Sequence, residues 1–93
     1  MRWFSMNEFV VLNRFREVCP VANVSDWSSD SLKKACHIAF KIIGFEPSDF
    51  DGSLERANKY SKSQDLCDFI WDVWRIDNDL VRFHKGRIFC AKS

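Results

Sequence analysis

Apolar residues recur along this chain at the spacing of an α-helix. The clearest pattern begins at Leu32, with apolar side chains at 32, 35, 36, 39, 40 and 43, which is the repeat of an amphipathic helix. Gly44 supplies a left-handed stop, and Pro47 follows in the next loop. We therefore predict a helix over about residues 31–43.

A first helix is predicted ahead of it. Ser5 and Glu8 have the spacing of a capping box, in which each side chain satisfies a free backbone N–H group of the other. Apolar residues then recur from Val11 to Cys19, and Pro20 ends the run because it lacks an N–H group.

Two more helices are expected in the second half. A short helix over about 48–60 is interrupted by Gly52. A long helix over about 64–84 has apolar residues at 66, 69, 73, 76, 80 and 83, with Ser63 as cap and Gly86 as stop. A short extended tail is expected at 87–91. The alternation typical of strands is missing, so the prediction is one all-α domain, 1–93, a four-helix bundle.

Composition supports a folded, water-exposed chain. Its hydrophobic fraction is 46% and its charged fraction 29%. No signal peptide or apolar stretch of about 18 residues is seen, so no contact with a membrane is expected. The four cysteines are widely spaced without a C-x-x-C motif, which favours reduced thiols in a cytoplasmic protein and no metal site.

The charge pattern and the motifs exclude several functions. Residues 45–80 carry nine acidic and four basic side chains, whereas residues 81–93 carry four basic and no acidic ones. Acidic residues at the start of the third helix would face phosphates in a helix-turn-helix, which argues against nucleic-acid binding. His37 and His84 have no nucleophile or carboxylate at motif spacing, and no phosphate loop is present, so the chain is not expected to be an enzyme.

Two surfaces outside the core pattern could bind a partner. Lys34, Ile38 and Ile42 share a flank of the second helix with Ser31, either as ordinary exposed residues or as a docking strip. On the fourth helix Trp71 stands beside Asp68 and Asp72. It is either a core residue under neighbouring helices or an aromatic anchor ringed by carboxylates for a basic partner.

The segment VSDWSSDSL, residues 24–32, precedes the second helix. Asp30 or Ser31 is predicted to be the N-cap of that helix. The free N–H groups and the helix dipole at this position also stabilise an anion, so a phosphodiester on Ser31 would be well placed.

This segment resembles the attachment loop of acyl carrier proteins, where an Asp-Ser-Leu opens the second of four helices. The likeness extends over about residues 24–70. The matching positions are Val24, Asp26, Asp30, Ser31, Leu32, Phe45, Pro47 and the run ANKYSKSQDLCDFI at 57–70. Lys33, Lys34 and Lys41 depart from the family, whose second helix is acidic. The basic helix therefore argues against partners of the general fatty-acid type.

The resemblance implies a carrier function. Ser31 would bear 4′-phosphopantetheine, loaded by a phosphopantetheinyl transferase, and its thiol would hold an acyl group as a thioester for partner enzymes. Asp30 would position the arm and Leu32 would anchor the loop. The alternative hypothesis is a protein of the same fold without the cofactor, an inhibitor, immunity or regulatory protein that binds another protein through Asp68, Trp71 and Asp72.

Overall fold

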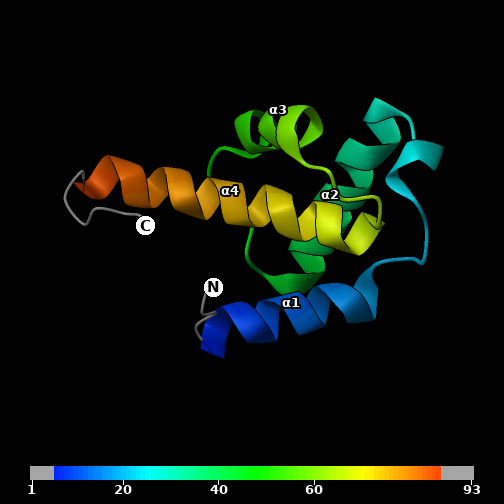
Figure 1. Ribbon diagram of the computed structural model, residues 1–93. Helices are drawn as coiled ribbons and strands as arrows, with labels where there is room; N and C mark the ends of the chain where they lie inside the picture. Colours follow the sequence, from blue (N-terminus) through cyan, green and yellow to red (C-terminus); the bar gives the residue numbers. More distant parts are fainter. Residues whose placement is uncertain (1–5, 87–93) are drawn as a thin grey trace.

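The computed structural model describes residues 6–86, with side chains at 8–78. Four α-helices follow one another (Figure 1): α1 (Met6–Val18), α2 (Ser29–Ile43), α3 (Phe50–Tyr60) and α4 (Leu66–Gly86), with a short 3-10 turn η1 (Val24–Asp26) between α1 and α2. Within residues 6–86 the extended pairing is limited to one isolated bridge, between Asn23 and Asp65. The predicted all-α fold with four helices is confirmed. The third helix is the shortest of the four, at 11 residues, and the fourth is the longest, at 21.

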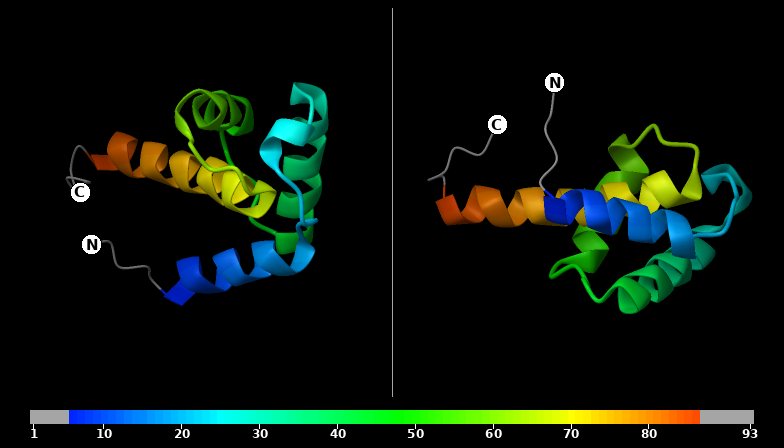
Figure 2. Two further views of the ribbon diagram at one scale, coloured as in Figure 1. Left: turned by 45° about the vertical axis from the view of Figure 1, so that its right-hand side comes forward. Right: turned by 90° about the horizontal axis from the view of Figure 1, so that it is seen from below.

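Helix α4 is the central element. It lies between α1 and α3, and it runs antiparallel to α1 (Figure 1). Helix α2 crosses α4 at a steep angle, and the last turns of α4 extend beyond the other helices in all three views (Figures 1 and 2). None of the helices in the described part of the chain is both long and apolar enough to span a membrane.

The core forms where α4 meets the other three helices. Phe15 on α1 is fully buried and meets Phe40 of α2 and Trp71 of α4 edge-on, with ring centroids 5.8 Å apart in both pairs. These contacts join three helices through one ring. Buried apolar side chains from all four helices complete the cluster: Val11, Phe15, Leu32, Cys36, Ala39, Phe40, Leu54, Ala57, Leu66, Cys67, Phe69, Ile70, Trp71 and Val73.

The observed helix ends can be compared with the predicted caps and stops. Gly44 ends α2 with φ of 87°, as expected for a left-handed stop. The expected cap of α4 is wrong, because Asp65 and not Ser63 accepts a hydrogen bond from the Asp68 N–H, at 3.1 Å. A carboxylate one residue before the helix is closer to its free N–H groups than a serine three residues before it. Ser5 and the tail at 87–91 lie outside the described residues.

The N-terminus of α3 is held by a residue from another helix. The buried Asp77 carboxylate accepts hydrogen bonds from the N–H groups of Ser48 and Asp49, at 3.0 and 2.7 Å, and from the Ser53 hydroxyl at 3.3 Å. Asp49 also caps the helix locally by accepting from Gly52 N–H. A Cβ at position 52 would collide with the Asp49 carboxylate. The glycine that interrupts the apolar pattern therefore leaves room for the capping side chain.

Candidate functional site at the N-terminus of α2

The loop before α2 is fixed against the start of α4. Val24 N–H donates to the Gln64 carbonyl at 2.9 Å, and Leu66 N–H donates to the Ala22 carbonyl at 3.0 Å. These two bonds continue the bridge between Asn23 and Asp65. The chain entering α2 is therefore held in place by backbone pairing with residues 40 to 44 positions further along the chain, as well as by its own turn.

Ser28 is the N-cap of α2. Its backbone is extended, with φ of −74° and ψ of 165°, and its Oγ accepts a hydrogen bond from Ser31 N–H at 3.2 Å. The predicted cap, Asp30 or Ser31, is therefore wrong, and the helix begins at Ser29. Both predicted residues lie within the first helical turn, where their backbones are already helical and cannot take the extended conformation of a cap.

Ser31 lies at the third position of this first turn. Its Oγ accepts a hydrogen bond from the Ser28 hydroxyl at 3.0 Å, and its side chain is half-buried. Leu32, the next residue, is only 5% exposed, so it fixes this turn against the core as expected. Asp30 is exposed beside it.

An apolar pocket opens next to Ser31. It has a volume of about 250 Å³ and lies between the end of α1, the following loop, α2 and α4. Ser31 and Lys34 are its polar residues, and the rest of the lining is apolar or thiol: Val18, Cys19, Pro20, Trp27, Ala35, Ile38, Ala39 and Ile70. Sequence reasoning missed this pocket, because its walls come from segments separated by up to 52 residues. Trp27 beside the serine-rich run was its one local signal.

The outer flank of α2 is apolar with a basic border. Ile38 and Ile42 are 60% and 48% exposed, as predicted for this flank. Lys34 and Lys41 are exposed along it, whereas Lys33 forms an ion pair of 2.9 Å with Asp51 of α3. The exposed strip continues to Phe45, which is 52% exposed.

The thiols around this site are neutral. Burial raises the pKa of Cys36 to about 12, and burial together with the adjacent Cys67 thiol raises the pKa of Cys19 to about 12. Burial also raises the pKa of Cys67. A neutral thiol is a poor nucleophile. These three cysteines are free, as the sequence indicates.

Asp65, Cys67 and Asp68 bring three potential metal-ligand atoms within 4.8 Å of one another, a cluster found within residues 6–86. Asp68 forms an ion pair of 2.9 Å with Arg16, and Asp65 caps α4. Both carboxylates therefore already have roles in holding helices.

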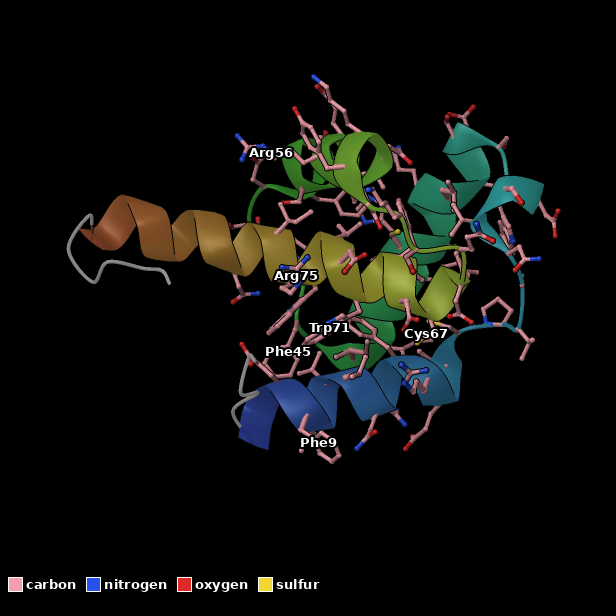
Figure 3. All side chains as sticks on the ribbon, in the orientation of Figure 1. Phe9, Phe45, Arg56, Cys67, Trp71 and Arg75 are labelled. Carbon is pink, nitrogen blue, oxygen red and sulfur yellow. The ribbon has the colours of Figure 1, made fainter. Side chains whose placement is uncertain are left out.

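Of the two interpretations of Trp71, the structure supports the core residue. Trp71 is 7% exposed, because Phe15 covers its edge and Trp74 stacks on its face at 5.1 Å. The two aspartates beside it are engaged within the chain: Asp68 binds Arg16, and Asp72 accepts a hydrogen bond from the Ser61 hydroxyl at 2.7 Å. Trp71 is thus the core residue that the first interpretation of its position predicts (Figure 3).

No family model, no curated protein and no solved structure matches this chain. The likeness to acyl carrier proteins stays a prediction from its residues.

Proposed function

We propose that this protein is a carrier that bears 4′-phosphopantetheine on Ser31 and presents an acyl or related group as a thioester to partner enzymes. One observation carries the proposal: the Ser31 hydroxyl lies in the first turn of α2, at the edge of an apolar pocket. The protein itself supplies attachment and docking, and the cofactor supplies the thiol.

The position of Ser31 suits a phosphodiester. The N–H groups of the first turn and the positive end of the helix dipole favour an anion at this point. Lys34 stands one turn further along the same flank and also lines the pocket. The apolar walls, including Trp27 and Ile38, suit the uncharged part of the arm or of its cargo.

The strip formed by Ile38, Ile42 and Phe45 supports docking of a partner enzyme. These side chains are about half exposed or more, and Lys34 and Lys41 border them. A complementary partner would present an apolar centre with acidic residues around it. The alternative of a binding module centred on Trp71 has no comparable support, because the side chain is buried.

The test is intact-protein mass spectrometry after incubation with coenzyme A and a broad-specificity phosphopantetheinyl transferase. We expect the native chain to gain one phosphopantetheine and Ser31→Ala to gain none. Ser29→Ala is the matched control, since Ser29 is an exposed serine in the same turn, and it should load like the native chain.

A double variant, Lys34→Glu with Lys41→Glu, tests whether the basic charge of α2 limits loading by the transferase. Both lysines are exposed, and the change gives α2 the acidic face that general transferases meet in acyl carrier proteins. The double variant should load at least as fast as the native chain. Failure of both folded proteins to load, or loading of Ser31→Ala, would contradict the proposal.

A further inference from the structure

A second pocket lies between α3 and α4 and shares no lining residue with the pocket beside Ser31. Its volume is about 540 Å³, within the range typical of small-molecule sites. It is lined by Glu55, Arg56, Lys59, Tyr60, Ser61, Asp72, Arg75 and Ile76. Figure 3 places Arg56 on α3 and Arg75 on α4.

The pocket concentrates positive charge in an acidic part of the chain. Residues 45–80 contain four basic side chains among nine acidic ones, and three of the four line this pocket: Arg56, Lys59 and Arg75. The fourth, Lys62, lies outside it in the following loop. Three cations face two carboxylates in the pocket, although the surrounding segment is strongly negative.

Asp72 does not neutralise the cations of α3. Asp72 accepts a hydrogen bond from the Ser61 hydroxyl at 2.7 Å and forms an ion pair of 3.5 Å with Arg75. The cation it binds is therefore on its own helix, α4. Within the described part of the chain, neither Arg56 nor Lys59 forms an ion pair. Both lie on one exposed face of α3, three residues apart.

The remaining lining offers an apolar and aromatic surface. Tyr60 is 67% exposed, with the Lys59 ammonium 5.3 Å from the centre of its ring, and Ile76 is partly buried on α4. An exposed ring beside a cation can stack against a flat ligand. Guanidinium groups bind phosphate oxygens through paired hydrogen bonds, and Asp72 orients one of them in advance.

We propose that this pocket binds an organic phosphate: Arg56, Lys59 and Arg75 hold the phosphate, and its flat body lies against Tyr60 and Ile76. The site uses no residue of the α2 region, so the proposal does not depend on a cofactor at Ser31.

The experiment is isothermal titration calorimetry of the full chain at low salt with ADP, adenosine and inorganic phosphate as separate probes. ADP should bind about tenfold more tightly than either adenosine or inorganic phosphate, because only ADP supplies both halves of the ligand. Equal binding of ADP and inorganic phosphate would overturn the role of Tyr60 and Ile76. No measurable binding of ADP at millimolar concentration would overturn the site.

Matched variants locate the binding. Arg56→Gln and Lys59→Gln should each weaken ADP binding about tenfold, as expected for the loss of a charge-assisted hydrogen bond. Lys62→Gln removes the same charge outside the pocket and should change the affinity less than twofold. Ser31→Ala should bind ADP like the native chain. Equal effects of Arg56→Gln and Lys62→Gln would overturn the assignment, since they would indicate attraction by net charge alone.

Discussion

The N-termini of α2 and α3 look alike in sequence, since serine and aspartate residues stand at both, yet the fold holds them in different ways. At α2 the cap is local and exposed, with Ser28 accepting from Ser31 N–H. At α3 the local cap by Asp49 is backed by Asp77, which lies 28 and 29 residues further along the chain than the two N–H groups it binds, those of Asp49 and Ser48, and is 5% exposed.

This difference separates a structural helix start from an accessible one. A buried carboxylate that accepts several hydrogen bonds is costly to remove, because its donors are then left without a partner. A local exposed cap costs less to lose, since water replaces it. Changes to side chains at the start of α2 should therefore cost little stability, whereas removal of the carboxylate at the start of α3 should cost much more.

The largest effect is expected for Asp77→Ala. Removing this carboxylate leaves the N–H groups of Ser48 and Asp49 and the buried Ser53 hydroxyl without their acceptor. We expect a loss of about 3 kcal/mol in the free energy of unfolding, measured by urea denaturation. Asp51→Ala is the control, since the Asp51 side chain is 77% exposed, and it should cost less than about 1 kcal/mol. Equal losses would remove the distinction between the two helix starts.

A smaller effect is expected for Ser28→Ala. The variant removes the side-chain acceptor of Ser31 N–H, and loss of such an N-cap costs about 1 kcal/mol. Ser29→Ala changes a neighbouring exposed serine that is already inside the helix and should be almost neutral in the same denaturation experiment. A Ser28→Ala cost as large as that of Asp77→Ala would contradict the view that the α2 cap is only a local one.

The smallest effect on stability is expected for Ser31→Ala. The variant loses one hydrogen bond, from the Ser28 hydroxyl, and keeps the backbone N–H that the cap uses. The free energy of unfolding should change by less than about 0.5 kcal/mol, and under the proposed carrier function the variant should not accept phosphopantetheine. A cost above about 2 kcal/mol would make Ser31 a structural residue and weaken the case for modification there.

Local patterns in the sequence predict most of the helices because their causes are local. The apolar repeat from Leu32 and the left-handed stop at Gly44 depend on neighbouring residues, and both appear in α2 as expected. The caps were harder to predict. Several serines and aspartates stand near the start of α2, and the loop before it is held by backbone pairing with the segment before α4, which a local pattern does not show.

The sequence by itself determined the all-α class, the order and approximate lengths of four helices and the exposed flank of α2, because helical periodicity and turn residues act over a few positions. Only the tertiary structure decided that Trp71 is buried under Phe15, that Asp77 binds the segment just before α3, and that two pockets form beside Ser31 and Arg56. Each of these depends on side chains far apart in the sequence, whose contacts are fixed by how the helices cross and pack.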